Sequence, residues 1–260
     1  MPPAADGAFA RWLAEQAGEL LCDLRAERGH DDPGELRRMG DKQSHNLIAT
    51  ALARWRPADE VLSEEGVRDA PGRLTAERVW IVDPLDGTRE YGEAGRIDWA
   101  VHIALWVRGS AAPAQLAAAA LGLPAQRRVL ATDFPPGYPP MSAEVATGGR
   151  IRLVVSRSRP AGFLVDLAER IDADLVPMGS AGAKIAAVIA GDVDGYVHAG
   201  GQYEWDSAAP VAVALATGLH ASRIDGSPLE YNRLDPLLPD VVVCRKDLAP
   251  RLLAALAAVR

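Results

Sequence analysis

The sequence has little cysteine, no long apolar run and no excess of positive charge, and each absence removes a class of protein. Its two cysteines, Cys22 and Cys244, lie far apart and form no metal-binding or redox spacing, so we expect two reduced, buried thiols. The first residues contain no basic region before an apolar core, and no apolar run approaches membrane-spanning length. These two absences predict a cytoplasmic protein with no membrane partner. The net charge of −7 argues against nucleic acid as a partner, whereas a small anionic substrate remains open.

Histidine is also scarce, and its five copies show no metal-ligand spacing. We therefore expect structural roles for all of them: His30, His45, His102, His198 and His220. The remaining composition is that of an ordinary globular protein. A chain of 260 residues is long enough for one large domain or for two subdomains that share an interface.

The spacing of apolar residues predicts an α/β (α+β) protein. Apolar positions at helical spacing predict one helix over residues 9–24 and a second after Asp41, with a polar loop at 29–39 between them. Strand patterns dominate residues 61–132, and short strands alternate with helices from 151 to 259. The stretch 134–149 is rich in proline and glycine and is the expected linker. The chain is thereby divided into an N-terminal α+β subdomain, 1–140, and a C-terminal α/β subdomain, 141–260.

The most informative motif follows an apolar run at residues 79–82 and reads Asp83-Pro84-Leu85-Asp86-Gly87-Thr88. We expect a buried strand that ends in a proline-restricted turn, from which both carboxylates aim at one point. Two convergent carboxylates repel each other unless a cation lies between them, and oxygen ligands favour Mg²⁺. Gly87 lets a ligand approach the backbone, and the following N–H groups can bind an anion. The alternative interpretation is an ordinary loop at a strand end.

Two further segments carry acids in a similar setting. One is Val61-Leu62-Ser63-Glu64-Glu65-Gly66, and the other is Tyr203-Glu204-Trp205-Asp206-Ser207. Together with the Asp83–Thr88 motif, this ordered set resembles the Li⁺-sensitive, Mg²⁺-dependent phosphatases of the inositol monophosphatase superfamily. Within that superfamily the chain is most similar to the CysQ branch, the 3′(2′),5′-bisphosphate nucleotidases, in their actinobacterial form. The resemblance covers residues 41–232.

The resemblance implies a layered α–β–α–β–α sandwich of the inositol monophosphatase and fructose bisphosphatase type, with the active site where the halves meet. It also implies two or three Mg²⁺ ions. Their ligands would be the side chains of Glu64, Asp83, Asp86 and Asp206 and the backbone carbonyl of Leu85. The first subdomain would carry most of these ligands, and the second would carry Asp206 and the substrate-binding segments. Asp41 and Thr88 would position and deprotonate a water molecule, with Glu65 beside them. Such a site hydrolyses a phosphate monoester without a protein nucleophile.

Each of these residues also has an alternative interpretation. Asp206 and Asp41 could simply be N-caps of the helices that follow them. Glu64 and Glu65 could be solvated loop acids, and Thr88 could satisfy backbone groups of a turn. The segment around Asp41 lacks the threonine that precedes the equivalent aspartate in the family.

The substrate-side residues follow from the nucleotidase branch of the resemblance. Arg89 continues the first motif as in that branch, and the Ser156–Arg159 and Gly179–Lys184 segments could hold a second phosphate. The expected substrate-binding residues are Gly87, Thr88, Arg89, Ser156, Arg157, Ser180 and Lys184. Inositol enzymes place a glutamate where this chain has Ala199, which weakens an inositol specificity.

The expected reaction is hydrolysis of the 3′-phosphate of 3′-phosphoadenosine 5′-phosphate to AMP, and of its sulfated relative PAPS to APS. The resemblance therefore points to sulfate assimilation and to a small phosphorylated substrate as the partner. A homodimer is compatible with it. Three alternatives stay open: an inositol-1-phosphate phosphatase, a fructose-1,6-bisphosphate phosphatase, and a catalytically silent regulator that binds metal or nucleotide.

Overall fold

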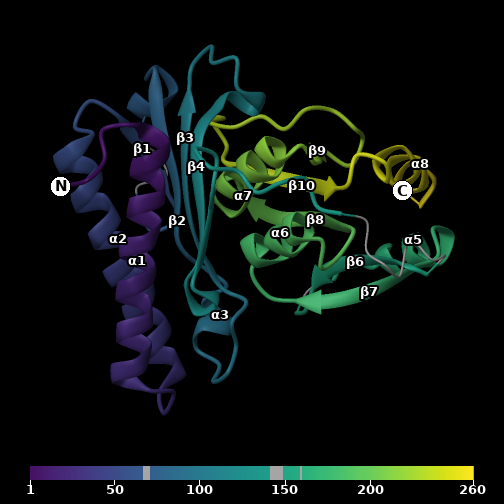
Figure 1. Cartoon of the computed structure of the whole chain (residues 1–260), viewed down its shortest axis with the longest axis horizontal. Coiled ribbons are helices and arrows are strands. Elements are labelled where there is room, and N and C mark those ends of the chain that lie inside the picture. Colours follow the sequence, from purple (N-terminus) through teal and green to yellow (C-terminus); the bar gives the residue numbers. More distant parts are fainter. Residues whose placement is uncertain (67–70, 141–148, 159, 260) are drawn as a thin grey trace.

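The chain folds into five alternating layers of helices and strands (Figure 1). The computed structural model describes residues 1–66, 71–140, 149–158 and 160–259. The first sheet has the order β1-β2-β3-β4-β5 and the second β7-β6-β8-β10-β9. The first sheet contains β1 (Glu60–Ser63), β2 (Arg78–Asp86), β3 (Ala100–Val107), β4 (Leu116–Leu123) and β5 (Arg128–Ala131). The second contains β6 (Ile151–Ser156), β7 (Ala173–Met178), β8 (Gly195–Tyr203), β9 (His220–Ser222) and β10 (Leu237–Cys244). The predicted α–β–α–β–α sandwich is confirmed.

The outer helical layers cover the far faces of the two sheets. Helices α1 (Asp6–Arg28) and α2 (Pro33–Trp55) pack on the first sheet, and α5 (Leu164–Arg170) and α8 (Ala249–Val259) pack on the second (Figure 1). Short helical turns fill the connections: η1 (Pro71–Leu74), α3 (Thr88–Tyr91), η2 (Pro113–Gln115) and η3 (Pro124–Gln126). Cys22 and Cys244 are both free thiols, as expected, although only Cys244 is fully buried.

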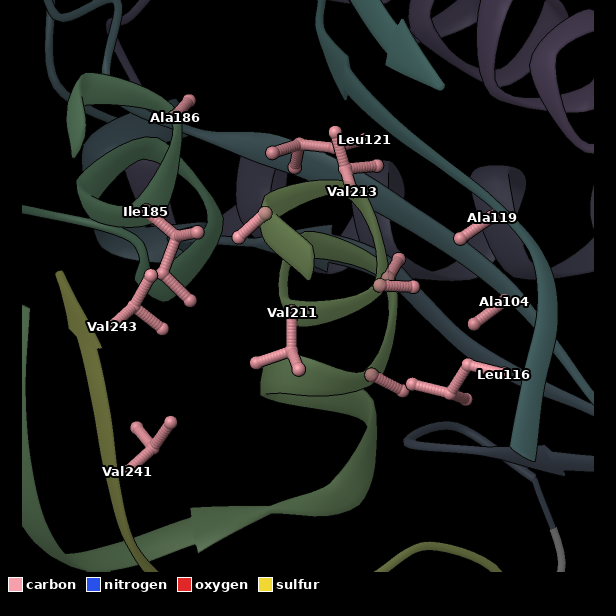
Figure 2. Close-up of a cluster of buried hydrophobic side chains, with 14 of the residues drawn as sticks. Ala104, Leu116, Ala119, Leu121, Ile185, Ala186, Val211, Val213, Val241 and Val243 are labelled. Carbon is pink, nitrogen blue, oxygen red and sulfur yellow. The ribbon is translucent and has the colours of Figure 1, made fainter. Parts of the chain in front are cut away.

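The central layer consists of α6 (Ala181–Ala190) and α7 (Glu204–Thr217). Both helices are apolar on nearly every side because sheets cover them from two directions. Figure 2 shows Val211 and Val213 of α7 between Leu116 and Leu121 of the first sheet and Val241 and Val243 of the second. The sheets and the central helices therefore share one hydrophobic core, which fixes the first turn of α7 against the ends of strands in both sheets.

The second helix begins earlier than the sequence pattern predicts. Residues 29–39 were expected to form a loop, but α2 starts at Pro33 and continues without a break past Asp41. Pro33 occupies the first helical turn, where its missing N–H is not needed, and Asp32 caps the helix by accepting a 3.0 Å hydrogen bond from the Glu35 N–H. Asp41 therefore lies in the middle of a helix, and the N-cap interpretation of this residue is wrong.

Two of the expected features fall partly or wholly outside the described residues. The proposed linker 134–149 includes residues 141–148, and Arg159 is likewise not described. The division at residue 140 accordingly stays a prediction. Within the described part of the chain, no helix is both long and apolar enough to cross a membrane.

Candidate active site

Three aspartates from two layers converge at the junction of the first sheet and the central helices. Asp83 and Asp86 lie at the end of β2, and Asp206 lies in the first turn of α7. One carboxylate oxygen from each of the three lies within 4.8 Å of the others. Among the described residues, these three acids form a group that could hold a metal ion. Asp83 and Asp86 are buried, and Asp206 is half-buried.

A bulge in β2 explains how Asp83 and Asp86 reach the same side of the sheet. Residues three apart in a regular strand point to opposite faces. Here Asp83 pairs with His102 and Asp86 pairs with Ala100, so β2 contains one residue more than β3 between these pairs. The sequence motif predicts a turn at Pro84, but β2 continues through it to Asp86, and the proline occupies the bulge.

Hydrogen bonds fix the carboxylate of Asp86. Its Oδ2 atom accepts a 2.6 Å bond from the Ser180 hydroxyl and a 2.7 Å bond from the Gly182 N–H, both at the start of α6. Gly87 follows with a φ of 83°, and a Cβ there would lie 2.9 Å from the Cβ of Ser180. Glycine is therefore required for β2 to approach α6 this closely.

Asp206 combines the two interpretations that the sequence left open. It is the third residue of α7, not its N-cap, and its Oδ2 atom accepts a 2.6 Å hydrogen bond from the Tyr203 N–H. This bond completes a capping box with Tyr203 as the N-cap residue. The same side chain contributes an oxygen to the three-aspartate group. Capping thus holds Asp206 in place without preventing contact with a cation.

The acids repel one another strongly. Burial raises the pKa of Asp83 well above its usual value, and the charges of Glu64, Asp86 and Asp206 raise it further. Burial and the Asp86 and Glu64 charges raise the pKa of Asp206 to about 7, against the lowering by the Tyr203 N–H. Glu64 therefore belongs electrostatically to the group. A set of carboxylate oxygens under mutual repulsion fits a hard divalent cation.

Asp86 behaves in the opposite way because its neighbours are donors and cations. Burial alone would raise its pKa, but His102, Lys184 and Ser180 together lower it to about 2. His102 is fully buried on β3, its Nδ1 donates to the Trp205 carbonyl at 2.9 Å, and its Nε2 lies 3.2 Å from Asp86 Oδ2. The sequence analysis predicts only a structural role for His102. The available signal for a role at the site was that His102 lies in the apolar run that follows the aspartate motif, which forms the strand paired with that motif.

Asp41 and Thr88 lie beside this group, on α2 and α3. The Thr88 hydroxyl is 3.1 Å from the Leu85 carbonyl and 3.4 Å from Asp41 Oδ1. Burial, together with Glu65 and Glu64, raises the pKa of Asp41 to about 7. Asp41 and Glu65 also line a cavity of about 580 Å³ that is separate from the cleft described next. A carboxyl with this pKa can accept a proton near neutral pH.

A polar cleft of about 320 Å³ opens beside the aspartates. Six of the seven predicted substrate-binding residues line it: Gly87, Thr88, Arg89, Ser156, Ser180 and Lys184. The buried Lys184 Nζ donates to the Ser180 carbonyl at 2.7 Å, and burial lowers the pKa of this lysine despite the nearby Asp86 charge.

The seventh residue, Arg157, is engaged by carboxylates. Its Nη2 lies 2.7 Å from Glu90 Oε1 and 2.9 Å from Glu93 Oε1. Because Arg157 follows β6 and both glutamates follow β2, these ion pairs join the two halves of the molecule. A larger cavity of about 1000 Å³ along α1 contains none of the clustered aspartates.

Fold and site together define a five-layered α/β protein with three clustered aspartates beside a small polar cleft. The chain belongs to the inositol monophosphatase family, whose profile matches residues 8–260. The family expected from the three sequence motifs is therefore confirmed.

Curated relatives cover almost the whole chain. It is 50% identical over 259 residues to the 3′-phosphoadenosine 5′-phosphate phosphatase of Mycobacterium leprae, a match that spans 96% of this chain and 93% of the relative. It is 51% identical over 242 residues to the protein of the same name from Mycobacterium bovis, spanning 93% and 89%. Among solved structures, CysQ from Bacteroides thetaiotaomicron superposes with a TM-score of 0.75 at 25% identity and covers 91% of this chain and 96% of that chain.

Proposed function

We propose that the protein is a Mg²⁺-dependent phosphatase that removes the 3′-phosphate of 3′-phosphoadenosine 5′-phosphate, and of its sulfated relative, to give AMP or APS and phosphate. The observation that carries the proposal is 50% identity across 96% of the chain to a phosphatase of that name. The convergence of Asp83, Asp86 and Asp206 beside a polar cleft supports it independently. The proposal includes inhibition by Li⁺, a cytoplasmic location and a role in sulfate assimilation, with a homodimer as the assembly to test.

The side chains of the site divide the work of hydrolysis between them. Glu64, Asp83, Asp86, Asp206 and the Leu85 carbonyl would hold two or three Mg²⁺ ions. When bound, Mg²⁺ supplies positive charge to the phosphate oxygens and to the leaving oxygen.

The water that attacks phosphorus needs a proton acceptor, and Asp41 can serve because its pKa is raised to about 7. The Thr88 hydroxyl, between Asp41 and the Leu85 carbonyl, would orient that water. Glu65 contributes negative charge beside Asp41. The water oxygen bonds to phosphorus and gives its proton to Asp41, the bond from phosphorus to the 3′ oxygen breaks, and the departing oxygen takes a proton from solvent water.

The cleft has the polarity required for a second phosphate. Arg89 lies at its exposed edge, and Lys184 lies buried at its wall beside Ser180, with Ser156 on the strand opposite. Arg157 would contribute by exchanging one of its carboxylate partners for a phosphate. Ala199 offers no side-chain oxygen for an inositol hydroxyl. These features favour a bisphosphorylated nucleotide over an inositol phosphate.

Phosphate release tests whether the protein is an enzyme at all. Purified protein is incubated with Mg²⁺ and a panel of monoesters comprising 3′-phosphoadenosine 5′-phosphate, inositol 1-phosphate and fructose 1,6-bisphosphate, and parallel samples contain EDTA. We expect Mg²⁺-dependent release, greatest with the nucleotide and reduced by millimolar Li⁺. Absence of release from every ester, with nucleotide binding retained, would instead identify a silent binding protein.

A further inference from the structure

We infer that a buried network of Arg73, Glu204 and Asn232 is a positioning device that holds the first turn of α7, and with it Asp206, in place at the proposed cation site. The inference rests on the proposed function of that site. None of the three side chains lines the polar cleft, so their effect is exerted through the backbone segments that they join. Each is almost inaccessible to solvent, with exposed fractions of 2% for Arg73, 1% for Glu204 and 8% for Asn232.

Hydrogen bonds hold residues 232–234 from two sides. From one side, Arg73 Nη1 donates to Asn232 Oδ1 at 2.9 Å, Arg73 Nη2 donates to the Leu234 carbonyl at 3.0 Å, and Asn232 Nδ2 donates back to the Arg73 carbonyl at 3.0 Å. From the other side, the two carboxylate oxygens of Glu204 accept the N–H groups of Asn232 at 2.6 Å and Arg233 at 2.8 Å.

One end of this network lies next to a proposed ligand. Glu204 is the first residue of α7 and stands two residues before Asp206. At the other end, Arg73 lies in η1, on the connection from β1 to β2. The segment 232–234 therefore links this connection of the first sheet to the helix that carries Asp206. A ligand held in position binds a cation more tightly than a mobile one, because less conformational freedom is lost on binding.

Packing alone does not account for these residue types. A buried arginine and a buried glutamate are costly unless every charge is compensated by good hydrogen bonds, and apolar residues would fill the space at lower cost. Asn232 is also specific in conformation, because its φ of 59° lies in the left-handed region that asparagine and glycine tolerate. The polar connection is thus maintained in a place where a simple core would serve for stability.

Asn232→Gly weakens the connection without straining the backbone. Glycine accepts the positive φ and keeps the N–H that donates to Glu204, so only the two side-chain bonds to Arg73 are lost. Arg73→Lys is the second variant: it keeps the charge but cannot contact both Asn232 and Leu234 with a guanidinium fork. The control is Asp194→Ala, which removes a buried carboxylate that accepts the Arg152 N–H at 2.8 Å. Arg152 lies at the end of β6 opposite to Ser156, which lines the cleft.

Direct binding of Mn²⁺, measured by electron paramagnetic resonance with substrate absent, provides a readout that does not depend on turnover. We expect both network variants to bind Mn²⁺ about tenfold more weakly than the unmodified protein. The control, Asp194→Ala, should bind Mn²⁺ with unchanged affinity. This should hold even if thermal unfolding in EDTA shows that the control and the network variants lose equal stability. Unchanged Mn²⁺ affinity in the network variants, or a loss in all three variants that follows stability, overturns the inference and leaves the proposed function intact. If the unmodified protein itself binds no Mn²⁺, the proposed cation site fails as well.

Discussion

At the scale of single residues, the site is made of groups that serve structure and chemistry together. Asp206 completes a capping box and contributes an oxygen to the three-aspartate group. The Ser180 hydroxyl caps α6 by accepting a 2.9 Å bond from the Ala183 N–H, and it donates to Asp86. Local reasoning about an acid near a helix start cannot separate capping from ligation, because the same geometry provides both. Two of the three motifs nevertheless predict which aspartates lie together, because each places its aspartates at the end of an element.

Asp86→Asn tests the role of the acid group most simply. The asparagine carbonyl can still accept the bonds from Ser180 and Gly182, but the NH₂ group that replaces the other oxygen cannot ligate a cation. We expect the circular dichroism spectrum and cooperative unfolding to be preserved and phosphate release to fall by about a hundredfold or more. A folded Asp86→Asn protein with full activity would end the metal-site hypothesis.

The raised pKa of Asp41 has a measurable effect on stability. An unfolded aspartate loses its proton near pH 4, whereas folded Asp41 holds its proton up to about pH 7. Between these values the folded state binds more protons, so the free energy of unfolding falls as pH rises. We expect urea unfolding of the metal-free protein to show this decline from pH 4 to 8, and Asp41→Asn to make it shallower. Equal declines in the two proteins would mean that Asp41 does not titrate in this range.

Lys184 provides a test of the second phosphate position. Losing one charge-assisted contact to a phosphate costs about 1.5–3 kcal/mol, which corresponds to roughly a tenfold loss of affinity or more. We expect Lys184→Met to raise the KM for 3′-phosphoadenosine 5′-phosphate by that factor and to affect a monophosphate ester much less. The matched control is Lys42→Met, which removes an exposed lysine on α2. An equal loss for both substrates would assign Lys184 to the fold or to the metal site instead.

At the scale of elements, the predictions succeeded where apolar periodicity is strong and failed where polar residues form helix. The strands at 79–82, 151–155 and 241–243 all exist, because continuous apolar runs can be satisfied only in a covered sheet. The first two turns of α2 are polar and contain Gly34, so periodicity misses them. The Asp32-Pro33 pair with Glu35 was the available signal for the true helix start.

Asp32→Ala tests this helix start. Removing the side chain that accepts the Glu35 N–H should cost about 1 kcal/mol of unfolding free energy, as is typical for the loss of an N-cap. Urea unfolding measures the loss, and kcat/KM should be unchanged because the cap lies more than two helical turns before Asp41. A strong loss of activity with unchanged stability would show that the helix start affects the site directly.

At the scale of the whole molecule, the site depends on contacts that no local pattern reveals. The bulge that aligns Asp83 with Asp86 is set by pairing with β3, and the approach of Gly182 to Asp86 is set by the packing of α6 between two sheets. His102, at the centre of this arrangement, belongs to a segment that by itself resembles any buried strand. Family resemblance predicts the joint pattern of acids, and the structure shows why Asp83, Asp86 and Asp206 meet.

The central claim is that this site prefers a 3′,5′-bisphosphate nucleotide. The measurement that tests it most directly is kcat/KM for 3′-phosphoadenosine 5′-phosphate and for inositol 1-phosphate, determined on one preparation at one Mg²⁺ concentration. We predict a value for the nucleotide at least about tenfold higher, because only the nucleotide has a second phosphate for the cleft that contains Lys184. A clearly higher value for inositol 1-phosphate would contradict the nucleotidase assignment, while leaving the role of the aspartates in place.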